Sequence, residues 1–99
     1  MKKKKPAMNK IMIDNEQTRV TEWKFTPGAS TGWHRHDYDY VVVPMVGGNL
    51  TIVDEKHNET EIKLKKGDAY FRKAGVEHDV VNNNLFEFSF VEIEFKASC

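Results

Sequence analysis

Three histidines stand at spacings that suit a metal site. His34 and His36 are two residues apart, and side chains at i and i+2 of a β-strand project from the same face of a sheet. His78, on a neighbouring strand, would complete a set of three imidazoles around one ion. Imidazole suits several divalent metals, and three protein ligands leave positions open for chemistry. We therefore predict one Fe, Mn, Ni, Cu or Zn ion held by His34, His36 and His78; the alternative is three hydrogen-bonded histidines without a metal.

The elements that must position these histidines are short β-strands. No window of eleven or more residues keeps apolar side chains at the helical spacing of i, i+3, i+4 and i+7. Alternating or β-branched runs bounded by turn residues recur instead, and we expect strands at residues 11–14, 18–26, 38–46, 50–55, 60–65, 69–72, 79–82 and 86–96. Short strands at this spacing, without helices, predict an all-β fold: a jelly-roll β-barrel or sandwich.

Two of these strands depart from simple alternation. The last strand carries phenylalanines of one parity up to Phe90 and apolar residues of the other parity from Val91 onward. A β-bulge near Phe90 would keep both sets on the core face, because an inserted residue shifts the alternation by one. Pro44 predicts an edge strand or a bulge, since proline cannot donate to a ladder.

Composition and charge narrow the function classes. Five of the 15 basic residues lie in the first ten positions, so residues 11–99 carry 10 basic against 15 acidic residues, a net charge of −5. Such a body is a poor nucleic-acid binder. Residues 1–10 are expected to form a disordered basic tail, with contact to nucleic acid or an anionic membrane as the alternative. Residues 11–99 are expected to form a single domain.

The expected localisation follows from the absence of a signal-peptide pattern, of a membrane-spanning stretch and of a cysteine pair. No apolar segment follows the lysines as in a signal peptide, and no stretch is long enough to span a membrane. Cys99 is the one cysteine, so no intrachain disulfide can form. Together these features favour the cytoplasm, where thiols stay reduced.

The histidines also lie within two longer patterns that resemble the motifs of the cupin family. The first motif of that family is matched in register by Gly28, His34, His36 and Gly47, with Tyr40 in place of its glutamate. The second motif is matched by Gly67, Gly75, His78 and Asn82, with Lys73 in place of its proline. The resemblance implies a small single-domain cupin domain over residues 11–99, a jelly-roll barrel with one metal in its mouth and a homodimeric assembly.

The resemblance leaves several functions open. A three-histidine metal with open positions resembles the sites of small cupin dioxygenases and of small cupin lyases, and the string from His34 to Pro44 resembles bacterial cupins labelled β-alanine degradation proteins. These imply a metal-dependent enzyme acting on a small organic acid. The alternatives are a non-catalytic module that binds a metal or a small molecule, and a structural cupin that has lost the metal.

Four further residues are candidates for the site. Tyr40 is expected to act as a fourth ligand, as a protonated donor beside the metal or as a general base, with packing as the alternative. Tyr38 shares parity with Tyr40 and is a candidate for substrate binding or for the core. Arg72 is a candidate to hold a substrate carboxylate in the mouth, or an ordinary surface charge. Asn82 either orients a ligand or caps a turn.

Overall fold

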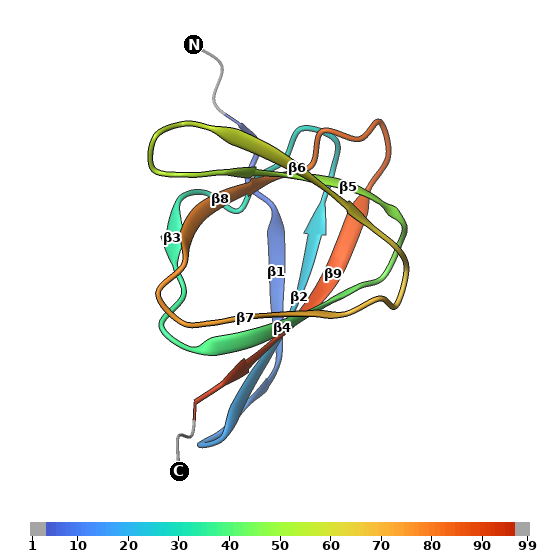
Figure 1. The fold of residues 1–99 in the computed structure, drawn as a ribbon. Helices are drawn as coiled ribbons and strands as arrows, with labels where there is room; N and C mark the ends of the chain where they lie inside the picture. The colour runs from blue at the N-terminus through green and yellow to red at the C-terminus, as the bar shows by residue number, and fades with distance from the viewer. Residues whose placement is uncertain (1–3, 97–99) are drawn as a thin grey trace.

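Two antiparallel sheets face each other across a small core (Figure 1). The computed structural model describes residues 4–96, and these contain strands and no helix. The five-stranded sheet has the order β1-β2-β9-β4-β7, and the four-stranded sheet has the order β3-β8-β5-β6. The strands are β1 (Met8–Asp14), β2 (Thr18–Phe25), β3 (His34–Arg35), β4 (Asp39–Pro44), β5 (Gly48–Val53), β6 (Glu59–Leu64), β7 (Tyr70–Arg72), β8 (Glu77–Val81) and β9 (Phe88–Phe95).

The predicted all-β jelly-roll barrel is confirmed, and eight of its nine strands overlap the expected ranges. The exception is β3, which has two residues and pairs with β8. So short a strand has no alternation pattern to detect, because alternation needs about four residues.

The predicted β-bulge near Phe90 is wrong. β9 pairs without a break with β2 on one side and with β4 on the other. Its burial alternates strictly from Phe88 to Glu94, so the residues that face inward after Phe90 are Glu92 and Glu94. Val91 and Ile93 face outward instead. The bulge was expected because it would have buried every apolar side chain, whereas the continuous strand places two carboxylates inside the barrel.

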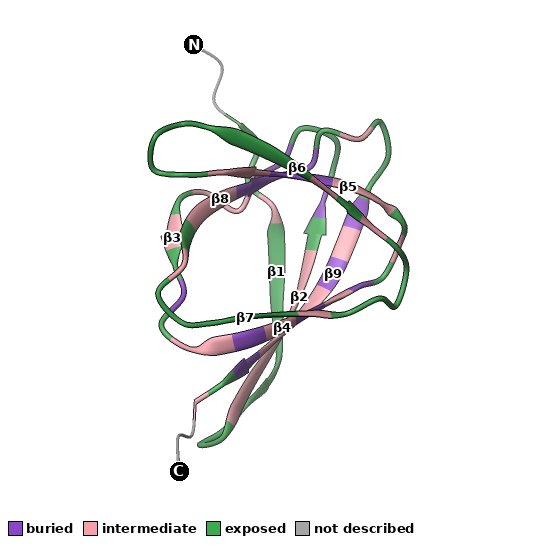
Figure 2. Ribbon diagram, viewed as in Figure 1, coloured by how far each residue is buried: buried purple, intermediate pink, exposed green. Residues whose placement is uncertain are grey.

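Aromatic and aliphatic side chains close one end of the barrel. Phe25, Phe88 and Leu50 are fully buried, and the rings of Phe25 and Phe90 lie 5.4 Å apart. Figure 2 shows that buried residues lie on β9, β4, β8 and β5, whereas the edge strands β1 and β6 are mostly exposed. The other end therefore has room for polar side chains.

Pro44 ends β4. The strand pairs with β7 from Tyr40 to Val42 and with β9 as far as Pro44. Pro44 therefore lies beyond the segment that β7 covers, and its missing N–H costs no hydrogen bond to that strand. The expectation of an edge position is met locally, although β4 is an interior strand.

The expected tail, residues 1–10, overlaps β1, which begins at Met8. Ala7 donates a backbone hydrogen bond to Ser30, and the amide of Ser30 donates to Lys5. Lys4 lies 3.4 Å from Asp79, on β8. These contacts place Lys4, Lys5 and Ala7 beside the barrel, and the disorder expected for the tail stays a prediction. The remaining lysines of the tail, with Cys99, lie outside the described residues.

The outer face of the five-stranded sheet carries an apolar patch. Val41, Val91 and Ile93 share this face with Phe71 and Phe95, and the two phenylalanines are 48% and 40% exposed. The expected homodimer stays a prediction.

Within the described part of the chain there is no helix of a length and hydropathy that would span a membrane.

Candidate metal centre

The histidines meet where β3 lies against β8. His34 and His78 are directly opposite each other in this antiparallel pair. His36 follows β3, and backbone hydrogen bonds hold it on both sides: its amide donates to Val76, and its carbonyl accepts from Gly75. Gly75 has a φ of 100°, a conformation that side chains with a Cβ rarely adopt. This turn places the backbone of His36 beside the histidine pair.

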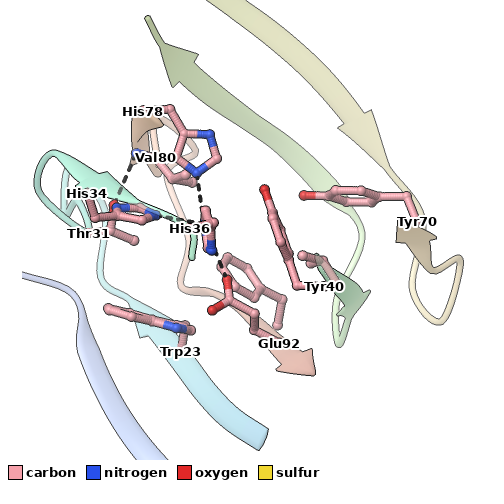
Figure 3. Close-up of a pocket in the computed structure, with 11 residues that line it drawn as sticks. Trp23, Thr31, His34, His36, Tyr40, Tyr70, His78, Val80 and Glu92 are labelled. Atoms are coloured by element: carbon pink, nitrogen blue, oxygen red, sulfur yellow. Dashed lines mark hydrogen bonds and ion pairs between the residues drawn. The ribbon is translucent and has the colours of Figure 1, made fainter. Parts of the chain in front are cut away.

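The three side chains converge on one point. The Nε2 atom of His36 lies 3.0 Å from Nε2 of His34 and 3.3 Å from Nε2 of His78 (Figure 3). Ligand nitrogens about 2.1 Å from a metal are separated by roughly 3.0 Å in octahedral geometry and roughly 3.4 Å in tetrahedral geometry. The spacing of the nitrogens therefore fits a common ion, as predicted from the sequence.

Hydrogen bonds fix the orientation of His34. Its Nδ1 lies 2.9 Å from the carbonyl oxygen of Gly32, which can only accept a hydrogen bond. Nδ1 of neutral His34 must therefore carry the hydrogen, which leaves the Nε2 lone pair free for a metal. The hydroxyl of Thr31 also lies 3.2 Å from Nδ1, and the same hydroxyl accepts a hydrogen bond from the amide of Val80 on β8.

Burial keeps two of the ligands neutral. It lowers the pKa of His36 to about 3, with further lowering by His34 and His78. Burial likewise lowers the pKa of His78 to about 4, and His34 lowers it further. Both rings are therefore uncharged at neutral pH and can offer a lone pair to a cation without first losing a proton.

Tyr40 packs face to face on His36. The two ring centroids are 3.9 Å apart and the planes differ by 18°. A metal bound to His36 lies close to the plane of its imidazole, whereas the Tyr40 ring occupies a parallel plane. Burial also raises the pKa of Tyr40. The geometry thus favours a protonated phenol beside the centre over a phenolate ligand.

An open cavity of about 250 Å³ reaches His78, whereas all three histidines line a smaller space of about 20 Å³. Its wall includes Tyr40, Tyr70, Arg72 and His78. Tyr40 and Arg72 are direct cross-strand neighbours in β4 and β7, and the guanidinium of Arg72 lies 4.6 Å above the ring of Tyr70. The structure therefore brings Tyr40 and Arg72 together at the mouth. Tyr38 is partly buried ahead of β4 and is not among the residues that line this cavity.

Two site residues were missed from the sequence. Glu92 of β9 lies with its carboxylate 3.9 Å from Nε2 of His36, and burial raises its pKa to about 7, with Glu94 adding to the shift. Tyr70 faces the same interior, and burial raises its pKa to about 12. Only the unbroken register of β9 against β2 and β4 reveals Glu92, whereas the spacing of two from Arg72 would have revealed Tyr70.

Other polar and aromatic side chains near the two motifs lie away from the three histidines. Trp33 is 50% exposed, Asp37 is exposed, and His57 lies exposed in the loop between β5 and β6. Asp39 is partly buried and accepts a hydrogen bond from the amide of Ala74. None of these side chains contributes to the group of His34, His36 and His78.

Comparisons with known proteins agree with this fold. The sequence model described as Cupin domain matches residues 21–94. The "Beta-alanine degradation protein BauB" of Pseudomonas aeruginosa is 49% identical over 90 residues, which are 91% of this chain and 94% of that protein. A crystal structure of a cupin domain from Bordetella pertussis is 48% identical, covers 98% of this chain and 100% of its own, and superposes with a TM-score of 0.93. The "Oxalate-binding protein" of Thermotoga maritima is 23% identical over 87% of this chain and 69% of its own length.

Proposed function

Because the chain belongs to the cupin family, we propose that it is a metal-dependent enzyme, of the dioxygenase or lyase type, that acts on a small organic acid. The observation that carries this proposal is the convergence of three imidazoles, one of which, His78, lines an open cavity. A bound divalent ion would supply Lewis-acid or oxygen-activating chemistry there. The name of the relative BauB refers to the breakdown of β-alanine, a short carboxylic acid, and supports the proposed substrate class.

The mouth of the cavity suits a carboxylate. Arg72 presents a planar cation whose position is restrained by Tyr70 and by a hydrogen bond to the carbonyl of Phe71. A guanidinium binds a carboxylate through two parallel hydrogen bonds. We expect the substrate carboxylate at Arg72 and its reacting carbon toward the histidines, with apolar walls from Ile52 and Ile62 along the way.

Replacing Arg72 with glutamine tests this substrate class. We expect the apparent affinity for β-alanine and for short oxo and hydroxy acids to fall about tenfold, the lower end of what a charge-assisted hydrogen bond contributes, because Arg72 is exposed to water. Binding is measured by calorimetry on metal-loaded protein, and turnover by oxygen uptake and mass spectrometry of the products. Lys73→Gln, the neighbouring cation that does not line the cavity, should leave affinity unchanged. If no acid of this panel binds or is consumed, the proposal is wrong.

Replacing Tyr40 with phenylalanine tests the proposed donor. The ring that packs on His36 remains, so metal content should not change, whereas the hydroxyl that hydrogen-bonds the substrate is lost. We expect turnover to fall about 100-fold, as for loss of a positioned acid or base. Elemental analysis and steady-state kinetics on the same preparation separate the two effects. Unchanged turnover would leave Tyr40 as a packing residue.

The second candidate function is a non-catalytic binding module. The cavity supports it, because a bound metal, the Arg72 guanidinium and the apolar walls would hold an acid without transforming it. The product analysis decides between the two functions. An acid that binds to the metal-loaded protein and is recovered unchanged after prolonged incubation in air would favour the module.

A further inference from the structure

Glu92 is a buried carboxylate that pairs with no lysine or arginine among the described residues. Glu92 is 8% exposed and lies in the middle of β9, between Thr21 of β2 and Val42 of β4. Among the described residues its one ion-pair partner by distance is His36, at 3.9 Å. At this distance the two side chains form no hydrogen bond, so the contact with His36 does not compensate for the buried carboxylate.

Without a bound cation, burying the Glu92 carboxylate in this way costs free energy of folding. Moving a carboxylate out of water costs several kcal/mol unless a cation or hydrogen-bond donors compensate. Glu94, the next inward-facing carboxylate, shows the usual solution, because Arg19 lies 3.7 Å from it. Glu92 has no such arginine. A positive charge is therefore expected close to its carboxylate in the working protein.

The cavity that Glu92 lines shows where this positive charge would lie. The enclosed space has a volume of about 20 Å³, and its wall includes His34, His36 and His78 together with Glu92. About 10–15 Å³ is enough for one water molecule, so the space admits one water or one ion. The indole N–H of Trp23, which lines the same space, is buried without a hydrogen-bond partner. Figure 3 shows Trp23 and Glu92 on the same side of the histidines.

We propose that Glu92 is the carboxylate partner of the metal, completing a centre of three histidines and one carboxylate. The inference rests on the proposed metal site and adds the residue that balances its charge. Tyr40 stands where the related motif has glutamate, but it stacks on His36, so the negative charge comes from the adjacent strand instead. Potential ligand atoms of His36, Glu92 and Glu94 lie within 4.8 Å of one another, and a turn of the Glu92 side chain brings its oxygen toward the ion.

The experiment compares metal binding by the full chain and two matched variants. Glu92→Gln and Glu94→Gln each remove one inward carboxylate from β9 at almost constant volume, but Glu94 has Arg19 as its partner. Chelator-competition titrations with Zn²⁺ and Co²⁺ give affinities, and the visible absorption of Co²⁺ reports the ligand set. Thermal unfolding without metal checks that each variant is folded. We expect Glu92→Gln to weaken binding at least tenfold, within the range of 10–100-fold known for groups that support a metal, and to change the Co²⁺ spectrum.

The outcomes separate this inference from the function on which it rests. Glu94→Gln should change affinity less than threefold and leave the Co²⁺ spectrum as it is. If the unmodified chain binds metal and Glu92→Gln binds it equally well with the same spectrum, Glu92 is not the partner, although the metal site stands. If the unmodified chain binds neither ion, the metal site itself is wrong and the inference falls with it. If both variants lose metal affinity to the same extent, the loss reflects the removal of any negative charge from β9, and the assignment to Glu92 is overturned.

Discussion

Replacing His36 with alanine should reduce metal affinity more than 100-fold. This histidine stands between the other two, within 3.3 Å of both Nε2 atoms, and it is 4% exposed. Its loss leaves two imidazoles and an opening at the centre of the set. Groups that only support a ligand contribute 10–100-fold, so removing a ligand should exceed that range. The measurement is metal content by mass spectrometry after dialysis, together with competition titration.

His57 provides the matched control for this prediction. It is the fourth histidine of the chain, exposed in the hairpin between β5 and β6, and its φ is 63°. Asparagine tolerates this conformation better than alanine does, so His57→Asn is the suitable variant. It should bind one equivalent of metal at the original affinity. One equivalent of metal in the His36→Ala protein at unchanged affinity would show that the histidines do not form the site.

Replacing Asn82 with alanine should destabilise the fold by about 3 kcal/mol or more, because each buried polar group left unpaired costs about 1–3 kcal/mol. Asn82 is fully buried. Its amide donates to the carbonyls of Phe25 and Phe86, at 3.0 and 2.9 Å, and its oxygen accepts from the amide of Asn84. Alanine would leave these backbone groups without partners. Urea unfolding of the metal-free protein measures the effect.

The neighbouring Asn83→Ala is the control for Asn82. Asn83 is exposed and donates one side-chain hydrogen bond, to Thr51, so its loss should cost about 1 kcal/mol or less. Metal affinity of folded Asn82→Ala protein should match that of the unmodified chain. A large loss of affinity at unchanged stability would instead make Asn82 a residue that orients a ligand.

The fold was predictable because its signals are local. Alternation along each strand and glycines at the turns mark a strand-rich chain without reference to tertiary contacts. The spacing of two between His34 and His36, with His78 in a second motif, identified the set of three that the structure brings together. Gly75, which the turn beside His36 requires because of its positive φ, could likewise be identified from the motif in the sequence.

The rest of the site depends on pairing between distant strands. Glu92 enters the interior because β9 keeps its register between β2 and β4, and no local pattern distinguishes that outcome from a bulge that buries Val91. Tyr40 lies on His36 only because the chain after β3 turns back into β4. Arg72 lies at the mouth because β7 is an edge strand paired with Tyr40. Asn82 joins the end of β2 to the turn before β9, which the sequence alone does not place together.

The unbroken alternation of β9 also determines where the chain can change length. Inward Glu92 and outward Val91 and Ile93 are consecutive residues, so inserting or deleting one residue at this point would exchange the two sets. Carboxylates would then lie on the apolar outer sheet, and branched aliphatic side chains would fill the space beside His36. Among descendants of this sequence, length variation should therefore accumulate in the exposed turn that precedes β9, around Leu85 (96% exposed), and be eliminated within the strand.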